Sequence, residues 1–239
     1  MRKRNPHQPD PDGVLLIDKP KEWTSHDVVA KIRNSFQLNK VGHGGTLDPN
    51  ATGLIMILIG RGTKLSAKIM GSDKTYEGEI LFGIETNSQD TDGEIVTEKD
   101  ATGIAEEQVR TEMKSVLGDQ MQMPPMVSAI KKDGVPLYKL ARKGQEVERE
   151  PRFIHIYKFA LREFTPPRAT FEVMCTKGTY VRTLAHDLGQ RLGCGACLSQ
   201  LRRTQSGEFN LSNAWKLDDA LTWDREELAK NLISVNQLT

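Results

Sequence analysis

The chain lacks any apolar run long enough to cross a membrane. The longest, LIMILI at residues 54–59, is far shorter than the roughly 20 residues that a membrane-spanning helix needs. The first residues, MRKRNPHQPDPDG, are basic and rich in proline, and they lead only into VLLI, which is too short for the hydrophobic region of a signal peptide. We therefore expect residues 1–12 to form a flexible basic tail on a cytoplasmic protein without a membrane partner.

The chain also lacks an excess of charge of either sign. Its 33 Lys and Arg residues balance 32 Asp and Glu residues, which leaves a formal charge of +1. A uniformly basic surface is thereby excluded, so binding of a polyanion such as a nucleic acid must depend on local patches. The length of 239 residues, with 37% hydrophobic and 27% charged residues, is typical of one large globular domain.

Cysteine is scarce, and motifs for common cofactors are missing. Cys194 and Cys197 form a CxxC pair with Cys175 as the third cysteine, but no fourth ligand is spaced for a closed zinc site. We expect three small packing residues in a reducing compartment, and no metal. A Walker phosphate loop, a HExxH zinc helix and a Ser-His-Asp order are all missing from the sequence.

Hydrophobic periodicity predicts strands in hairpins with helices between them. The predicted strands cover residues 14–17, 54–59, 75–83, 154–164, 169–176 and 196–209. The predicted helices are one capped by TSHD, then 64–70, 104–117, 137–142 and 177–193, with further helix in the final residues. This order predicts an α+β fold around a mixed, mainly antiparallel sheet flanked by helices.

The segment HGGTLDPNATG, residues 43–53, places an ionisable carboxylate in a loop rich in glycine. Pro49 pushes Asp48 toward an extended backbone, and the glycines allow conformations that other residues avoid. These constraints would hold the Asp48 carboxylate in one presented position. By itself, such a segment is more often a plain turn that the aspartate begins, so a catalytic interpretation needs partner residues elsewhere.

Several residues could be those partners. An anionic nucleophile or base must stay ionised, and arginine, here Arg182 at the start of a helix, never loses its charge. Lys64 in GRGTK is a second candidate, although a basic turn is more often solvated surface. Tyr76 and Tyr180 could stack on a planar base, although such tyrosines often belong to the core. His43 fits a cap, a proton shuttle or a ring stacked on RNA.

Six sequence blocks follow one another between residues 13 and 213. They are DKPKEWTSHDVV, GHGGTLDPNATGLI, GRGTK, SDKTYEGEILFG, QMPPMVSAIK with GVPLYKLARKG, and KGTYVRTLAHDLG before GCGACLSQLRRTQSG. In this order the blocks closely resemble those of the TruB-type tRNA pseudouridine synthases. One departure is Glu22, where the first motif of that family normally has glycine. We expect it to alter loop packing rather than activity.

The resemblance implies an isomerase that converts uridine 55 in the T loop of tRNA to pseudouridine, after flipping the base out and without a cofactor. It implies that Asp48 is the catalytic aspartate, that Tyr76 stacks on the base and assists proton removal, and that Arg182 pairs with the aspartate. The resemblance leaves open whether Asp48 attacks the uracil, attacks the sugar or acts as a general base.

The resemblance also implies a closed substrate pocket. Tyr180 and Leu201 would line it together with Tyr76, and His43 would reach the T loop and hold the base outward. An apolar wall would keep the detached uracil from escaping. The alternative is a tRNA-folding chaperone or T-arm binding protein without turnover, but the intact set of aspartate, tyrosine and arginine favours the enzyme.

We expect a catalytic domain at residues 13–213 with an RNA-binding insertion around 120–145, and a helical C-terminal tail at 214–239. Many bacterial members continue into a small RNA-binding domain of the PUA type, which we expect to be absent or rudimentary here. The T arm of tRNA would then be bound by a monomer with no obligate protein partner. The candidate contacts to RNA phosphates are Lys64, Lys131, Lys132, Arg142 and Lys143.

Overall fold

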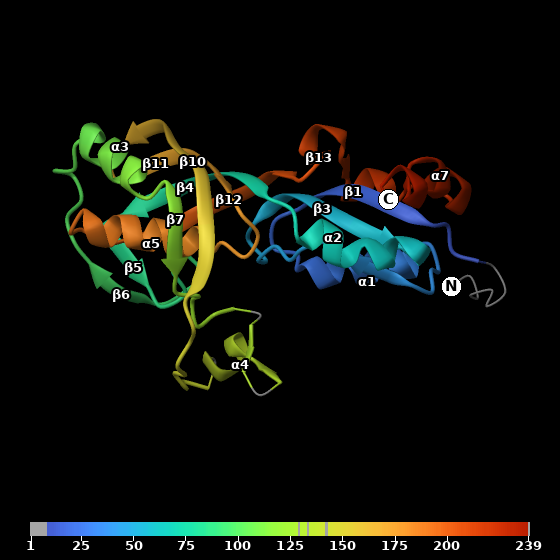
Figure 1. The fold of residues 1–239 in the computed structure, drawn as a ribbon, viewed down its shortest axis with the longest axis horizontal. Coiled ribbons are helices and arrows are strands. Elements are labelled where there is room, and N and C mark those ends of the chain that lie inside the picture. Colours follow the sequence, from blue (N-terminus) through green and yellow to red (C-terminus); the bar gives the residue numbers. More distant parts are fainter. Residues whose placement is uncertain (1–8, 129, 133, 142, 239) are drawn as a thin grey trace. The chain divides into compact units, whose positions relative to one another are not determined.

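The computed structural model describes residues 9–128, 130–132, 134–141 and 143–238. These residues belong to two compact units, the first made of Met1–Tyr76 and Arg202–Thr239 and the second of Glu77–Leu201. Figure 1 shows the elements of both units. Within the described ranges no helix is both long and apolar enough to cross a membrane.

The first unit has a mixed sheet in the order β14-β1-β3-β12. Strand β1 (Gly13–Lys19) pairs antiparallel with β3 (Thr52–Ile59) along its whole length, and β14 and β12 run parallel to their neighbours. Strands β4 (Lys74–Phe82) and β12 (Ala196–Ser206) contribute residues to both units. The other elements of the first unit are α1 (Ser25–Ser35), β2 (Val41–His43), η1 (Gly60–Leu65), α2 (Ser66–Met70), β13 (Phe209–Asn210), η2 (Leu211–Asn213), β14 (Trp215–Lys216), α6 (Leu217–Ala220), α7 (Arg225–Lys230), β15 (Ile233–Ser234) and η3 (Val235–Gln237).

Continuous apolar runs place β1 and β3 at the centre of the first unit, because strands covered on both faces need apolar residues at every position. Val14 to Ile17 and Leu54 to Ile59 are all at most 5% exposed. Helix α1 begins with the capping box that TSHD predicts: the Thr24 side chain accepts from the Asp27 amide, and the Asp27 carboxylate accepts from the Thr24 amide.

The second unit contains the strand order β12-β4-β11-β10-β7. Helix α3 packs on β10 and α5. The elements of this unit, apart from the shared β4 and β12, are β5 (Ile84–Thr86), β6 (Ile95–Glu98), α3 (Glu106–Ser115), β7 (Gly118–Gln122), β8 (Lys131–Lys132), β9 (Val135–Pro136), α4 (Leu137–Ala141), β10 (Arg152–Thr165), β11 (Arg168–Cys175) and α5 (Val181–Arg191).

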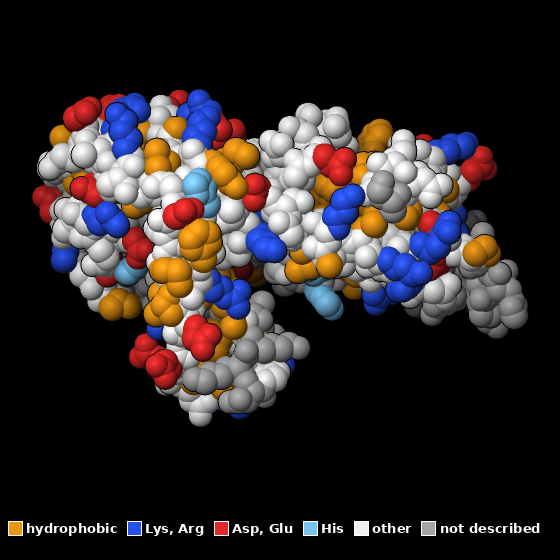
Figure 2. Space-filling model, in the orientation of Figure 1, with side chains coloured by type: hydrophobic (Ala, Val, Ile, Leu, Met, Phe, Trp, Pro, Cys, Tyr) orange, Lys and Arg blue, Asp and Glu red, His pale blue; other side chains and the backbone are white. Residues whose placement is uncertain are grey.

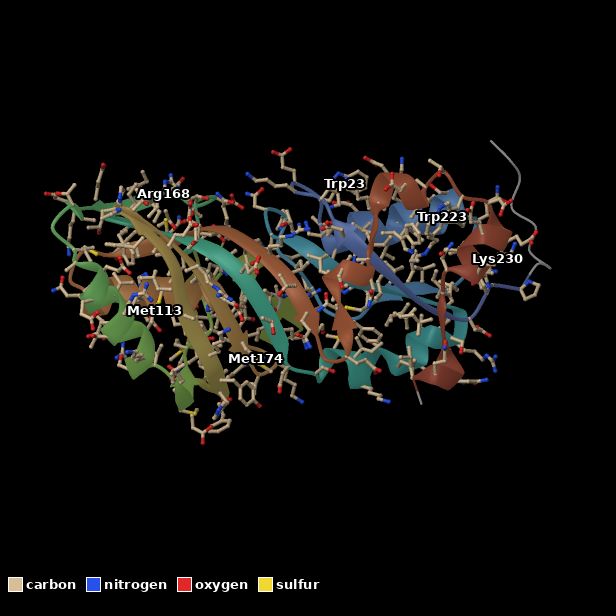
Figure 3. The ribbon with its side chains drawn as sticks, turned by 90° about the horizontal axis from the view of Figure 1, so that it is seen from above. Trp23, Met113, Arg168, Met174, Trp223 and Lys230 are labelled. Carbon is tan, nitrogen blue, oxygen red and sulfur yellow. The ribbon has the colours of Figure 1, made fainter. Side chains whose placement is uncertain are left out.

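The predicted α+β fold with a mixed, mainly antiparallel sheet is confirmed. On β11, the buried residues Ala169, Phe171, Val173 and Cys175 alternate with more exposed ones. On α3, Val109 and Met113 are buried, and Figure 3 labels Met113, which is 1% exposed.

The C-terminal residues differ from the helix that we expected. Helices α6 and α7 are short, while β14 and β15 both pair with β1, and Leu238 lies in the core that β1 and β3 form. Trp215 and Trp223, the second of which Figure 3 labels, meet edge to face with ring centroids 5.0 Å apart. Two-residue strands carry no periodicity, so only their pairing with β1 defines them.

The departure at Glu22 has a local consequence. Its φ is +69°, in the left-handed region that favours glycine, which explains why glycine suits this position in the first motif.

Gly53→Ala should destabilise the protein strongly. Gly53 has a φ of +95°, and an added Cβ would lie 2.4 Å from the Arg203 carbonyl oxygen and 2.8 Å from its amide nitrogen. We expect a loss of roughly 2–4 kcal/mol in the free energy of unfolding, measured by urea denaturation. The matched control is Gly103→Ala, because nothing lies within 4 Å of an added Cβ there. Equal stability of the two variants would contradict the explanation.

Candidate active site

The loop that carries Asp48 is fixed at both ends by strands of the first unit. His43 on β2 lies opposite Ile57 on β3, and the Gly44 amide donates to the Met56 carbonyl at 2.8 Å. The Ala51 amide donates to the Asp48 carbonyl at 3.1 Å, which closes a turn around Pro49. The half-buried Asp48 side chain is therefore carried on a short, tightly anchored turn.

Two buried side chains hold the backbone of this loop. The Ser25 hydroxyl accepts from the Leu47 amide at 2.8 Å and donates to the Leu47 carbonyl at 3.1 Å. The Lys19 ammonium is fully buried, and it donates to the carbonyls of Pro20 at 3.0 Å, Trp23 at 2.5 Å and Pro49 at 2.9 Å. Residue 47 is thus tied to α1, and residue 49 to the end of β1.

Burial lowers the pKa of Lys19 to about 8, from an ordinary value of 10.5. The carboxylates of Asp48 and Asp27 act in the opposite direction, while the nearby Arg203 lowers the pKa further. The Asp48 carboxylate therefore favours the charged form of Lys19, the side chain that anchors the loop.

Arg203 is the largest buried cation of the first unit, with 1% of its surface exposed. Its Nε donates to the Leu54 carbonyl at 2.8 Å and its Nη2 to the Gly45 carbonyl at 3.2 Å. The guanidinium also hydrogen-bonds the phenol oxygen of Tyr76, a β4 residue that is 9% exposed. Burial lowers the pKa of Arg203, and the tyrosine opposes that shift. One cation thus joins the loop, β3 and Tyr76.

His43 is half-buried at the end of β2, and burial is the first cause that lowers its pKa. Electrostatic interactions with His26 and Arg203 lower the pKa further, and the rings of His26 and His43 have centroids 6.4 Å apart. The Gly45 amide donates to Nδ1 at 3.4 Å, which places the proton of the neutral ring on Nε2.

Arg182 lies in the first turn of α5 in the second unit and is 5% exposed. Its Nη1 lies 3.3 Å from a carboxylate oxygen of Asp90, and its Nη2 donates to the Val127 carbonyl at 2.8 Å. Its Cζ lies 5.9 Å from the ring centroid of Tyr180, the N-cap residue of α5. Tyr180 is itself fixed, because its backbone N–H and C=O both bond the Gln122 side chain.

The segment 87–94 holds Asp90 in place beside Arg182. The Thr183 hydroxyl donates to the Gln89 side chain at 2.7 Å, and the Leu198 amide on β12 donates to the Gln89 carbonyl at 3.0 Å. The Asp90 carboxylate accepts from the Ser88 hydroxyl at 2.5 Å. These bonds tie the segment to both α5 and β12.

The predicted site residues therefore belong to two groups, each described within its own unit. His43, Asp48 and Tyr76 lie in the first unit, where Arg203 contacts the loop and Tyr76. Arg182 and Tyr180 meet in the second unit, where Leu201 is half-buried on β12.

The predicted RNA-backbone residues are described only in part. Lys64 in η1 and Lys143 after α4 are exposed. The side chains of Lys131 and Lys132 on β8, and the whole of Arg142, lie outside the described residues.

Sequence reasoning missed Lys19, Arg203 and Asp90 as parts of the site. Lys19 ends an apolar run, and Arg203 belongs to a basic doublet in a strand, which are weak signals for buried cations. Asp90 lies in a polar stretch that predicts only a loop. Complete burial of a charge depends on the tertiary fold, so local sequence gave little indication of these roles.

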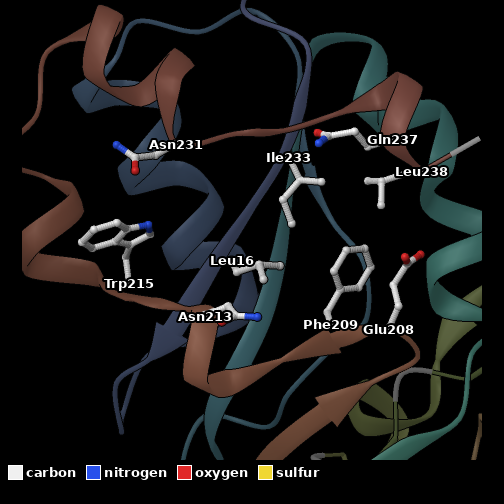
Figure 4. Close-up of a pocket in the computed structure, with 9 residues that line it drawn as sticks. All are labelled: Leu16, Glu208, Phe209, Asn213, Trp215, Asn231, Ile233, Gln237 and Leu238. Atoms are coloured by element: carbon white, nitrogen blue, oxygen red, sulfur yellow. The ribbon is translucent and has the colours of Figure 1, made fainter.

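Figure 4 shows a pocket of about 410 Å³ in the first unit. Leu16, Phe209 and Ile233 are among its apolar lining residues, with Trp215 on one side. None of the lining residues is a predicted site residue, so this pocket is distinct from the loop that carries Asp48.

Two models of one protein family match adjacent parts of the chain. The N-terminal domain of the TruB family pseudouridylate synthases matches residues 33–181. The C-terminal domain of tRNA pseudouridylate synthase B matches residues 182–238.

Full-length relatives agree with these matches. A protein of Opitutus terrae named tRNA pseudouridine synthase B is 54% identical over 226 residues, which cover 95% of this chain and 94% of the relative. Proteins with the same name from Syntrophotalea carbinolica and Bordetella avium are 46% and 44% identical, and the chain covers 73% and 93% of them.

Solved structures share the fold. The structure described as a Cbf5-Nop10-Gar1 complex matches with a TM-score of 0.71 and 29% identity, over 92% of this chain and 60% of that one. An archaeal box H/ACA sRNP Nop10-Cbf5 complex matches with a TM-score of 0.69 and 26% identity, over 93% and 59%. The chain thus spans about 60% of the length of these structural relatives. Together, the family matches and the relatives show that the chain belongs to the TruB family of pseudouridylate synthases, which confirms the resemblance of its sequence blocks and makes the protein an isomerase.

Proposed function

We propose that the protein converts uridine 55 in the T loop of tRNA to pseudouridine, without a cofactor. The observation that carries the proposal is the half-buried Asp48, carried on a turn whose backbone is held by Ser25, Lys19 and Arg203. Relatives named tRNA pseudouridine synthase B support tRNA as the substrate. A backbone held in this way presents the Asp48 side chain from one fixed position.

The reaction breaks the bond from the sugar carbon to N1 of uracil, turns the base, and joins the same carbon to C5. In the proposal, the ionised Asp48 adds to the base, captures the sugar carbon, or removes a proton to begin glycal formation. After the new bond forms, the proton on C5 leaves to restore the aromatic uracil. Tyr76 is proposed to stack on the base and assist this transfer.

Arg182 is proposed to pair with Asp48 and keep its carboxylate ionised. A guanidinium has five N–H donors, so its bonds to Asp90 and Val127 are compatible with a further partner. Its burial at the start of a helix and its two oriented contacts support this role. The Asp90 carboxylate holds the plane of the guanidinium in a fixed direction.

The remaining site residues are proposed to hold the substrate. His43 would reach the T loop and stabilise the flipped base, while Tyr180 and Leu201 would form walls around the uracil. Lys64, Lys143 and the cations of the 120–145 segment would contact phosphates of the T arm. The division into domains, the reduced PUA region, the monomeric state and the cytoplasmic location remain predictions from the sequence.

Asp48→Asn should abolish turnover and leave tRNA binding nearly unchanged. The amide keeps the shape of the side chain but cannot act as a nucleophile or base. Pseudouridine formation is measured by mass spectrometry on a tRNA transcript, and affinity by fluorescence anisotropy. The control is Asp218→Asn, an exposed aspartate on α6 that should retain wild-type turnover.

Two outcomes would oppose the proposed function. Tight tRNA binding by the wild-type protein without any pseudouridine would favour the chaperone or T-arm binding alternative. Pseudouridine at a uridine other than 55 would retain the chemistry but contradict the proposed position.

Arg182→Lys should reduce turnover at least a hundredfold, with at most a few-fold loss of tRNA affinity. Lysine keeps the positive charge but lacks the planar guanidinium that donates to two partners at once. Single-turnover rates at saturating enzyme separate the two effects. Arg191→Lys, at the exposed end of the same helix, is the matched control. Near-normal turnover of the first variant would remove the proposed role of the guanidinium.

Lys19→Met should cost roughly 2–4 kcal/mol of stability at pH 7, because three backbone carbonyls lose their charged donor. The stability difference should also depend on pH. The pKa of Lys19 is about 8 in the folded protein and 10.5 ordinarily, so the unfolded chain holds more protons between these values. The free energy of unfolding of the wild type, relative to the variant, should therefore rise from pH 8 to 10.5. Urea denaturation across this range tests it, and a constant or falling difference would contradict it.

A further inference from the structure

A stripe of rings lies open on one face of β10 in the second unit. Phe153 and His155 occupy alternate positions, which point to the same face of a strand. Tyr157 follows where the pairing of β10 with β11 is irregular, and its ring centroid lies 4.5 Å from that of His155. Phe153 is 64% exposed and Tyr157 is 47% exposed, whereas the intervening Ile154 and Ile156 are buried. We call these three residues the ring stripe.

The neighbouring strands extend this surface. Met121 on β7 lies opposite Phe153 and is 61% exposed, and Met174 on β11 lies opposite Lys158 and is 37% exposed. Figure 2 shows hydrophobic side chains gathered along the face where Figure 1 places β7 and β10, and Figure 3 labels Met174. Large apolar side chains this exposed are costly to keep in water, so their gathering on one face indicates a binding surface.

Polar contacts hold the rings in place. The His155 Nδ1 lies 2.5 Å from a carboxylate oxygen of Asp119, the residue opposite it on β7. The rings of His155 and Tyr157 have centroids 4.5 Å apart and are tilted by 49°. The stripe is therefore partly ordered before any ligand arrives, which reduces the entropy lost on binding.

Cations border the stripe. Glu172 on β11 contacts both Lys158 and Arg162 of β10, so one carboxylate faces two positive charges. Two cations and one carboxylate leave a single net positive charge at this border, which suits a polyanion.

These features favour RNA over a protein partner. The centre of a protein interface is depleted in charged residues, whereas here the His155–Asp119 pair lies within the stripe. Single-stranded RNA needs flat rings for its bases and cations for its phosphates, and exposed aromatic rings on a sheet are a common platform for two or three bases.

We propose that the ring stripe stacks unpaired nucleotides of the RNA substrate, with residues other than those proposed to act on the target uridine. The inference rests on the proposed function only in taking tRNA as the RNA. It adds a second determinant of substrate choice, in which Phe153 and Tyr157 contribute affinity by stacking.

The test replaces both rings by aliphatic residues of similar size, as Phe153→Leu with Tyr157→Leu. Both positions are open to water, so the fold should persist, and circular dichroism with thermal unfolding checks this. The dissociation constant for a tRNA transcript is measured by anisotropy over a series of salt concentrations. We expect affinity to fall by roughly tenfold or more, since each stacked base contributes substantially. The slope of affinity against salt should stay unchanged, because the rings carry no charge.

The matched control removes exposed apolar groups elsewhere in the same unit, as Ile95→Ala with Val96→Ala on β6, which are 60% and 67% exposed. This variant should bind tRNA like the wild type. Irradiation of the wild-type complex with a 4-thiouridine transcript should cross-link a peptide that contains residues 153–157.

The outcomes are separable from those of the proposed function. If the wild type forms pseudouridine but the ring variant binds tRNA with unchanged affinity, the stripe is not an RNA platform. An altered self-association in sedimentation, with unchanged RNA affinity, would assign the surface to a protein contact and overturn the proposal. Absence of pseudouridine with the wild type would count against the proposed function, while the binding comparison would still decide this inference.

Discussion

The first unit is organised around one buried charge. A guanidinium that is removed from water needs hydrogen-bond acceptors for its N–H groups. Arg203 has them in the carbonyls of Gly45 and Leu54 and in the Tyr76 phenol. Those groups come from the loop that carries Asp48, from β3 and from the start of β4. The need to satisfy a single cation therefore brings three parts of the chain into fixed relation, and Gly53 gives the backbone room to approach it.

The second unit uses the same principle with a different partner. Arg182 is buried beside a carboxylate, Asp90, and a carbonyl, Val127. The segment 87–94 that supplies Asp90 is tied to α5 by Thr183 and to β12 through Leu198, so its position does not depend on local turn preference alone. In both units, an arginine surrounded by backbone and side-chain acceptors fixes loops that would otherwise be free to rearrange.

Much of this fold could be predicted from local sequence, and the reasons are specific. The run at residues 54–59 is apolar at every position because β3 is covered on both faces, and Thr24 with Asp27 is a cap whose spacing is readable. Proline and glycine around Asp48 indicate only a fixed turn, and Asp48 becomes a catalytic candidate because the ordered blocks resemble those of a known family. Lys19 and Arg203 could not be predicted from local sequence, since nothing in a basic residue's neighbours along the chain reveals that carbonyls distant in sequence will surround it. The short strands β14 and β15 escaped prediction for the same reason.

The pairing of the C-terminal strands with β1 has a consequence for synthesis on the ribosome. Strand β1 emerges before residues 77–201, whereas β14 and β15, which pair with it, emerge after them. Residues 77–201 are continuous and can begin to condense as they are made, whereas the sheet around β1 must wait until residues 215–234 have been made. The surroundings of the loop that carries Asp48 are therefore completed only after the second unit has been synthesised.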